Sequence, residues 1–341
     1  MQTGSYVNGK WYHPASKSIS KNINPADTSD VIAEYSLASS ADVRLAIDAA
    51  VAAFPAWRKT PGPERGRVLW RAANIARSRV DDIAKTLTRE EGKILKEARG
   101  EVLKGISLLE YYAGEGFRMH GKTLPSESRD TFTYTVRQPL GVVGLIAPWN
   151  FPWAIPVWKS APAIVSGNCV VFKPAELTPA TSVLLAEIYE EAGLPPGVFN
   201  MLIGTGREVG EAMVNAPELR AISFTGSNNV GNALYVKAAQ RGAKVTCEMG
   251  GKNAVIVMPD ADLQGGDCHP WRRVRVERPA LHRHLARDRA SRHQERAGRS
   301  TGCGREADQA GPRPGRRDRH GALGGRSAMA DGDGLHQGRP G

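Results

Sequence analysis

The feature that most constrains the fold of this chain is an alternation of short apolar runs with helical stretches between residues 141 and 252. The apolar runs are Gly141–Ala147, Cys169–Lys173, Phe199–Ile203, Ala221–Phe224 and Lys244–Cys247, and the helical stretches are Phe151–Ser166, Thr178–Ala192, Glu208–Ala216 and Val230–Gln240. Strands that alternate with helices of about 10–15 residues are typical of parallel sheets. The sequence therefore predicts an α/β fold with a doubly wound, Rossmann-like parallel sheet.

Other elements precede this region. Tyr6–Trp11 contains Asn-Gly between short apolar runs and predicts a hairpin. Apolar residues at helical spacing predict helices over Ser40–Phe54, Pro63–Glu91 and Lys93–Glu115. Thr131–Arg137 alternates with period two, so we expect an exposed strand in a β-arm at about residues 126–140, an edge that a partner subunit can cover.

Chemically informative residues follow each predicted strand of the parallel sheet. In such sheets ligands bind beyond the carboxyl ends of the strands. The five motifs are Ala147-Pro-Trp-Asn-Phe-Pro152, Phe172-Lys-Pro-Ala-Glu176, Gly204-Thr-Gly-Arg-Glu-Val-Gly210, Phe224-Thr-Gly-Ser227 and Glu248-Met-Gly-Gly-Lys252. A single Gly-x-Gly is weak evidence, but five motifs in order at successive strand ends are specific.

With these motifs the chain resembles the aldehyde dehydrogenase superfamily over about residues 5–264. The longer match that includes Tyr111–Gly116, Trp149–Pro152 and Ile155–Trp158 looks most like the branch that oxidises α-ketoglutaric semialdehyde (2,5-dioxopentanoate). The resemblance implies an NAD(P)-dependent oxidoreductase that converts an aldehyde to a carboxylic acid. It also implies a homo-oligomeric parent enzyme whose small-molecule partner is the aldehyde.

Two residues have candidate catalytic roles. The side-chain amide of Asn150 suits an oxyanion donor, the role that the family gives to the Asn of this motif; the alternative is an Asn that caps a helix. The resemblance makes Glu248 the general base that activates a thiol or a water. Without the resemblance, Glu248 would be an ordinary surface acid.

A second set of residues is expected to bind the cofactor. The ammonium group of Lys173 and the carboxylate of Glu176 can hold ribose hydroxyls, and that carboxylate would repel a 2′-phosphate, which favours NAD over NADP. Gly226 and Ser227 open a helix whose N–H groups suit a pyrophosphate. The alternatives are a solvated Lys–Glu pair, a plain Ser cap, and a tight turn at Gly206. The full set is Ala147, Pro148, Trp149, Lys173, Glu176, Gly206, Gly226, Ser227, Val230 and Gly250, with no metal ligand among them.

The composition changes abruptly after Gln264. Residues 265–341 contain seventeen Arg and no Lys, lack Ile, Phe, Tyr and Asn, and hold six of the eight His. The missing types mostly have A/T-rich codons and the abundant types have G/C-rich codons. Translation of G/C-rich DNA in the wrong frame filters residues in this way, whereas selection for a folded core does not.

The same break removes the family's nucleophilic Cys from the reading frame, because His282 stands at its position. In a shifted frame, the second and third bases of each codon are read together with the first base of the next codon. When synonymous codons are chosen freely, Trp271–Ala290 read in this frame can encode Gly-Gln-Arg-Cys-Thr within a family-like run. The Cys then arises at the Leu281–His282 junction, and His320–Arg339 can also encode a family-like stretch. We infer the loss of two bases near codon 265, and expect the translated chain to be inactive.

These observations give the expected domains and partners. Residues 1–250 should form the NAD(P)-binding domain, 251–264 the start of a catalytic domain that is essentially missing, and 265–341 a disordered tail. The tail supplies +8 of the net charge of +11, with nine acids among its Arg, which argues against a nucleic-acid-binding arm. No apolar run approaches the roughly 18 residues of a membrane span. Four Cys without paired spacing favour a cytoplasmic protein. A non-catalytic dinucleotide-binding protein stays open as the alternative function.

Overall fold

The computed structural model describes residues 2–16, 18–252, 254–255 and 286–287. The described residues fall into two compact units, one that runs to Glu248 and one that begins at Met249. The first unit contains a seven-stranded sheet with the strand order β11-β10-β7-β8-β9-β1-β2. The predicted α/β class is therefore confirmed.

Parallel strands form the middle of this sheet. They are β7 (Val142–Ile146), β8 (Cys169–Lys173), β9 (Phe199–Met201) and β10 (Leu219–Gly226). β7 pairs in parallel with both β8 and β10, and β8 pairs in parallel with β9. β8 is buried along its whole length, as expected for a strand with helices on both faces. β11 (Lys244–Met249) forms one edge of the sheet.

The predicted N-terminal hairpin extends the other edge. β1 (Ser5–Val7) pairs antiparallel with both β2 (Lys10–Tyr12) and β9. Asn8 and Gly9 both have positive φ angles, 52° and 73°. That conformation is the reason why Asn-Gly is favoured in two-residue hairpin turns.

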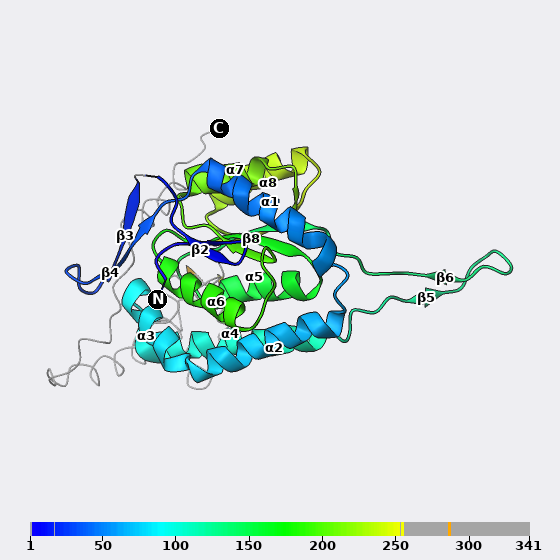
Figure 1. Cartoon of the computed structure of the whole chain (residues 1–341), viewed down its shortest axis with the longest axis horizontal. Helices are drawn as coiled ribbons and strands as arrows, with labels where there is room; N and C mark the ends of the chain where they lie inside the picture. The colour runs from blue at the N-terminus through cyan, green and yellow to red at the C-terminus, as the bar shows by residue number, and fades with distance from the viewer. Residues whose placement is uncertain (1, 17, 253, 256–285, 288–341) are drawn as a thin grey trace. The chain divides into compact units, whose positions relative to one another are not determined.

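Helices cover both faces of the sheet (Figure 1). α1 (Ser40–Trp57), α7 (Glu211–Asn215) and α8 (Asn228–Gln240) lie on one face. α5 (Ala154–Val165) and α6 (Pro179–Glu191) lie on the other face. A further layer of helices packs on α5 and α6; it consists of α2 (Gly62–Ser78), α3 (Val80–Glu91) and α4 (Leu95–Glu115). The largest fully buried side chains include Trp153, Tyr35 and Tyr189. None of the described helices is long and apolar enough to span a membrane.

Two helical predictions differ from the structure. The single helix predicted over Pro63–Glu91 is broken at Arg79, whose φ and ψ of −115° and 16° leave the helical region. The helix predicted over Glu208–Ala216 begins as a π-helical turn, Gly206–Gly210, before α7. Apolar periodicity continues through Arg79 and gives no signal of a change of direction there.

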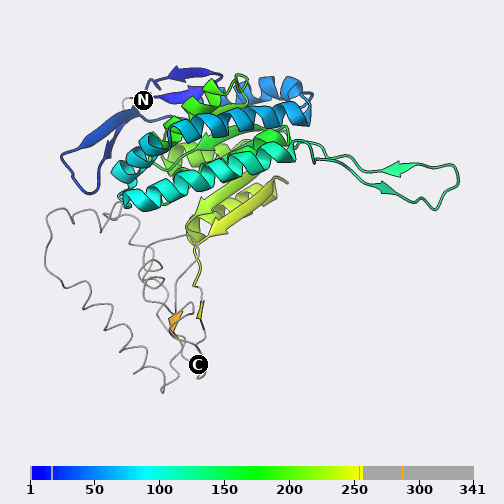
Figure 2. The same ribbon diagram turned by 90° about the horizontal axis from the view of Figure 1, so that it is seen from below.

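The predicted arm is a hairpin that projects from the first unit (Figures 1 and 2). Its strands β5 (Thr123–Leu124) and β6 (Thr133–Tyr134) are shorter than the strand predicted over Thr131–Arg137. Phe132 and Tyr134 on the arm are 75% and 62% exposed. The prediction of an exposed arm is thus confirmed, and its cover by a partner subunit stays a prediction.

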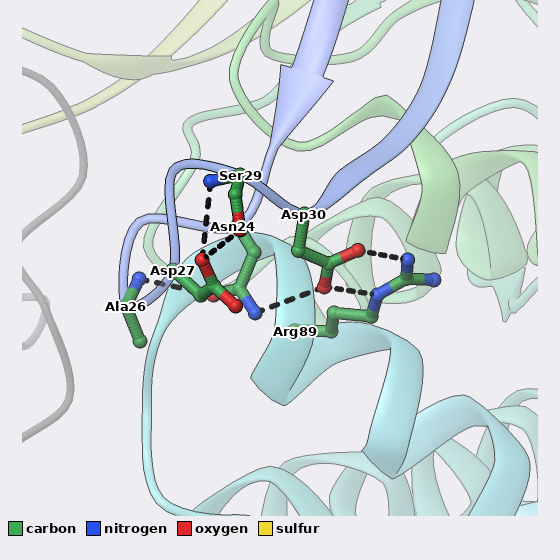
Figure 3. A network of polar contacts seen from close by, with 6 residues as sticks. All are labelled: Asn24, Ala26, Asp27, Ser29, Asp30 and Arg89. Atoms are coloured by element: carbon green, nitrogen blue, oxygen red, sulfur yellow. Dashed lines mark hydrogen bonds and ion pairs between the residues drawn. The ribbon is translucent and has the colours of Figure 1, made fainter.

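A second hairpin, which was not predicted, is formed by β3 (Ile19–Ile23) and β4 (Val31–Ser36). Its turn is held to α3 by Asp30, which accepts from the guanidinium of Arg89 and, at 3.1 Å, from the Asn24 amide (Figure 3). The Arg89 bond lowers the pKa of Asp30 to about 2. Asp27 closes the turn by accepting from the Ser29 backbone N–H at 3.1 Å.

The predicted tail lies almost wholly outside the described residues. The described exception is Ala286–Arg287 (β13), which pairs in parallel with Ala254–Val255 (β12). The predicted domain boundaries and the predicted disorder of residues 265–341 stay predictions.

Candidate functional site

The strand order reverses beside β7, and this reversal fixes where a ligand can bind. From β7 the chain moves outward to β8 and β9, and then returns to place β10 on the other side of β7. In doubly wound sheets a crevice forms at such a switch point, beyond the carboxyl ends of the two strands. Ile146 pairs with Phe224, so the loop that follows β7 and the Gly226–Ser227 segment leave the sheet next to one another.

Lys173, Glu176 and Gly206 come together beyond β8 and β9. The Lys173 ammonium lies 3.9 Å from Glu176, and the Gly206 backbone N–H donates to Glu176 Oε1 at 2.7 Å. Lys173 is only 4% exposed, and this burial lowers the pKa of its ammonium to about 8, against the opposing attraction of Glu176. Glu176 itself is exposed. The alternative of a solvated Lys–Glu pair is therefore wrong for Lys173.

Ser227 is the N-cap of α8 and accepts from the Val230 backbone N–H at 3.5 Å. This bond is long, and Val230 is 54% exposed at the first turn. Free N–H groups at the start of a helix attract anions, so capping by Ser227 and phosphate binding are compatible.

The two glycines predicted to contact the cofactor differ in their surroundings. A Cβ at Gly226 would lie 2.5 Å from Cζ of Phe224, so the packing of that ring already requires a glycine there. A Cβ at Gly206 would meet no atom within 4 Å. Gly206 is also not among the glycines with a positive φ angle, so the alternative of a tight turn does not require a glycine there.

Asn150 lies in the loop between β7 and α5, together with Ala147, Pro148 and Trp149. Its backbone carbonyl accepts a hydrogen bond from Lys93 Nζ at 2.8 Å. α5 begins at Ala154 with Trp153 as its N-cap. The alternative interpretation of Asn150 as a helix cap is therefore wrong.

Glu248 lies within β11, because that strand continues to Met249 and does not end at Cys247 as predicted. Its carboxylate interacts electrostatically with the ammonium group of Lys159 of α5. Lys159 Nζ donates a hydrogen bond to Ser223 Oγ at 2.8 Å. Burial lowers the pKa of Lys159 to about 8, and Glu248 opposes this shift. β10 separates the strand of Glu248 from β7, which leads to Asn150. Gly250 directly follows β11 in the chain and belongs to the second unit.

The two described cysteines are poor nucleophiles. Cys169 is fully buried in β8, and burial raises the pKa of its thiol to about 12. Burial also raises the pKa of Cys247, whose Sγ lies 3.7 Å from the carbonyl of Gly231. The thiolate is the reactive form, so both shifts disfavour attack. Cys268, His282 and Cys303 lie outside the described residues.

Three charged residues that lie close to the Asn150 loop or to Glu248 were not predicted from the sequence: Lys159, Lys93 and Glu101. Lys159 is the single charged residue of a largely apolar helix, Ala154–Val165, and that isolation was a usable signal. Lys93 and Glu101 sit among other charged residues of α4 and its start, where spacing gives no indication of their contacts.

A family model described as "Aldehyde dehydrogenase family" matches residues 11–265. The chain belongs to the aldehyde dehydrogenase family. The match includes Asn150, Glu248 and every strand-end motif described above.

Two relatives of this aldehyde dehydrogenase chain have a stated substrate. Over 260 residues it is 48% identical to the α-ketoglutaric semialdehyde dehydrogenase of Bacillus subtilis, covering 76% of this chain and 53% of the relative. It is 46% identical to the 2,5-dioxopentanoate dehydrogenase of Saccharolobus solfataricus, covering 71% and 51%. The chain thus spans about half the length of the curated relatives it matches.

Solved structures agree with the family fold. An NADP-dependent enzyme of E. coli aligns with a TM-score of 0.83 and 33% identity, over 89% of this chain and 63% of that one. An NAD-dependent benzaldehyde dehydrogenase of Corynebacterium glutamicum aligns with a TM-score of 0.73 and 38% identity, over 76% and 56%.

Proposed function

We propose that this chain derives from an NAD(P)-dependent aldehyde dehydrogenase that oxidises an aldehyde to a carboxylic acid. The observation that carries the proposal is that the family's motifs stand at or directly after the carboxyl ends of the parallel strands β7, β8, β9 and β10, while Glu248 lies within the edge strand β11. α-Ketoglutaric semialdehyde is the first candidate substrate, since relatives at 48% and 46% identity bear that aldehyde, or its synonym 2,5-dioxopentanoate, in their names.

Asn150 and Glu248 are the proposed catalytic residues. The amide N–H groups of Asn150 would donate to the oxyanion that forms when a nucleophile adds to the aldehyde carbonyl. Glu248 would take the proton from a thiol or from the water that releases the acid. Its exposed carboxylate interacts electrostatically with the ammonium group of Lys159, which supports a role in proton transfer.

The residues beyond the strand ends fit a dinucleotide. Lys173 supplies a buried cation, Glu176 an exposed carboxylate, and the first turn of α8 supplies backbone N–H donors after Ser227. We assign the ribose to Lys173 and Glu176, and the pyrophosphate to Gly226, Ser227 and Val230. Ala147, Pro148, Trp149 and Gly206 complete the proposed contacts within the first unit, and the contact expected for Gly250 stays a prediction. The bound cofactor would supply the hydride acceptor.

The exposed carboxylate of Glu176 favours NAD over NADP in this proposal. A 2′-phosphate next to Glu176 would bring two anions together, and Lys173, whose Nζ lies 3.9 Å from Glu176 Oε1, would offset part of that repulsion. Glu176→Gln should therefore improve NADP⁺ binding relative to NAD⁺ binding. An unchanged ratio of the two dissociation constants would argue against this assignment.

The chain as translated is proposed to bind the dinucleotide without turnover. Among the described residues the thiols are Cys169 and Cys247, and burial raises the pKa of both. Oxidation through a thioester needs a thiolate, from whose adduct the hydride departs. This observation favours the second candidate, a non-catalytic dinucleotide-binding protein, for the translated chain itself.

Cofactor titration tests the part of the function that this chain retains. We expect NAD⁺ to bind the purified full-length chain, and Lys173→Met and Ser227→Val to weaken that binding. Lys122→Met on the exposed arm serves as the matched control. NAD⁺ binding that is absent, or that is insensitive to Lys173 and Ser227, would overturn the assignment of the site. Turnover requires the restored reading frame.

A further inference from the structure

The loop between β7 and α5, residues 147–153, depends on outside contacts for its shape. It contains Asn150, and two of its residues, Pro148 and Pro152, have no backbone N–H to donate. α5 begins at Ala154 without a side-chain cap from its own N-cap residue, Trp153. The partners that hold this segment therefore come from elsewhere in the chain.

Lys93 holds the middle of the loop. It follows α3 after Gly92, whose φ of 88° ends that helix in a left-handed conformation. Lys93 Nζ donates to the Asn150 carbonyl at 2.8 Å and lies 4.3 Å from the centre of the Phe151 ring. One ammonium group thus contacts the backbone of Asn150 and the side chain of the next residue.

Glu101 holds the end of the loop and the start of α5. Its Oε1 accepts from the backbone N–H groups of Trp153 and Ala154, each at 3.0 Å. Its Oε2 accepts from Lys93 Nζ at 2.7 Å. The Glu101 carboxylate therefore caps α5 from α4 and also fixes Lys93 against the loop.

Trp153 adds an apolar anchor at the same place. The side chain is fully buried, and its Nε1 donates to the Val102 carbonyl of α4 at 3.2 Å. A Cβ at Gly105 would lie 2.2 Å from that Nε1, so the ring packs directly on the backbone of α4. The contact requires a glycine at position 105.

The Lys93–Glu101 pair is shielded from water. The two side chains are 10% and 2% exposed, and Glu91 lies 3.9 Å from Lys93 as a second carboxylate. Buried pairs give little net stability compared with apolar residues of the same volume, but they hold a fixed geometry when each charge is hydrogen-bonded. The contacts of this pair converge on the segment that carries Asn150.

We propose that Lys93 and Glu101 are positioning residues that fix the backbone of residues 150–154 and thereby aim the Asn150 side-chain amide into the site. The catalytic significance of this proposal rests on the proposed function of Asn150 as the oxyanion donor. Its structural content, the fixed orientation of that amide, can be measured without catalysis.

The test uses the full chain labelled with ¹⁵N-Asn, and compares Lys93→Met with Lys96→Met. Lys96 is exposed in the first turn of α4, the helix that carries Glu101, and serves as the control. The Asn150 side-chain resonances are assigned by their loss in Asn150→Asp. We expect Lys93→Met to shift or broaden them, and to speed hydrogen exchange of the Trp153 and Ala154 amides about tenfold, while exchange in α1 stays unchanged. Lys96→Met should change neither signal.

Two further variants extend the test. Lys93→Arg keeps the cation and should restore part of the wild-type resonances and exchange rates. If Lys93→Met does not fold, Glu101→Gln takes its place in the comparison with Lys96→Met. Unchanged Asn150 resonances in folded Lys93→Met, or exchange that speeds equally throughout the chain, would overturn the proposal. Failure of the wild-type protein to bind NAD⁺ would contradict the proposed function instead. The resonance and exchange results could still be interpreted in that case, because they do not depend on NAD⁺ binding.

Discussion

Removal of the Glu90 carboxylate should be among the most destabilising single changes in the first unit. Glu90 lies at the end of α3 and is 3% exposed. It accepts from the backbone N–H groups of Ala180 and Thr181 at 2.8 and 2.7 Å, and from the Asn22 side-chain amide at 2.8 Å. One carboxylate thus joins α3 to the N-terminus of α6 and to the β3–β4 hairpin.

The magnitude follows from the donors that Glu90→Leu would leave behind. Each buried donor without a partner costs about 1–3 kcal/mol, and partial relaxation lowers the sum, so we expect a loss of about 3–5 kcal/mol of unfolding free energy. Glu90→Gln keeps one acceptor oxygen and should cost about 1–2 kcal/mol. Glu110→Leu removes a carboxylate from the surface pair with Arg77 and should cost less than about 1 kcal/mol.

The assay is urea unfolding of the full-length variants, followed by circular dichroism at the helical band. A loss on this scale is a large part of the stability of an ordinary domain, so Glu90→Leu should shift the midpoint far below that of Glu90→Gln. Equal midpoints for Glu90→Leu and Glu110→Leu would refute the reasoning, because they would show that the three donors find other partners.

Two further predictions concern the proposed cofactor site. Burial lowers the pKa of Lys173 to about 8, so its ammonium is charged below that pH and neutral above it. The affinity for NAD⁺, measured by titration between pH 7 and 9, should therefore fall as the pH rises. If the affinity of Lys173→Met fell as steeply with pH as that of the wild type, the role of Lys173 would be contradicted. A Cβ at Gly226 would clash with the Phe224 ring, whereas a Cβ at Gly206 would meet open space. Gly226→Ala should therefore lower the free energy of unfolding by about 1–3 kcal/mol, and Gly206→Ala by less than about 0.5 kcal/mol. Equal urea midpoints for the two variants would contradict this prediction.

The sequence predicted the parallel sheet well because its strands are short apolar runs bounded by glycine-rich or polar segments. The β3–β4 hairpin escaped prediction because its turn is held by Asp30 and Arg89, which are far apart in the sequence. The break at Arg79 was missed because helical periodicity continues across it.

Contacts between distant segments explain what was missed at the candidate site. Lys93 and Asn150 are 57 residues apart, and no spacing rule links them. The strand ends, by contrast, could be predicted, because the chain order of a doubly wound sheet brings them to one edge. The extent of β11 was misjudged because Glu248 and Met249 continue the strand into the motif that was assigned to a turn.

The most direct test of the central claim is NADH formation with α-ketoglutaric semialdehyde, and with simple aliphatic aldehydes, before and after two bases are restored near codon 265. The chain as translated should bind NAD⁺ but form no NADH, because the nucleophilic Cys is out of frame, and the restored chain should turn over. Turnover by the unrestored chain would contradict the account. If it survived the change of Cys247, Cys268 and Cys303 each to Ser, the reaction would not need the thiolate on which the account depends.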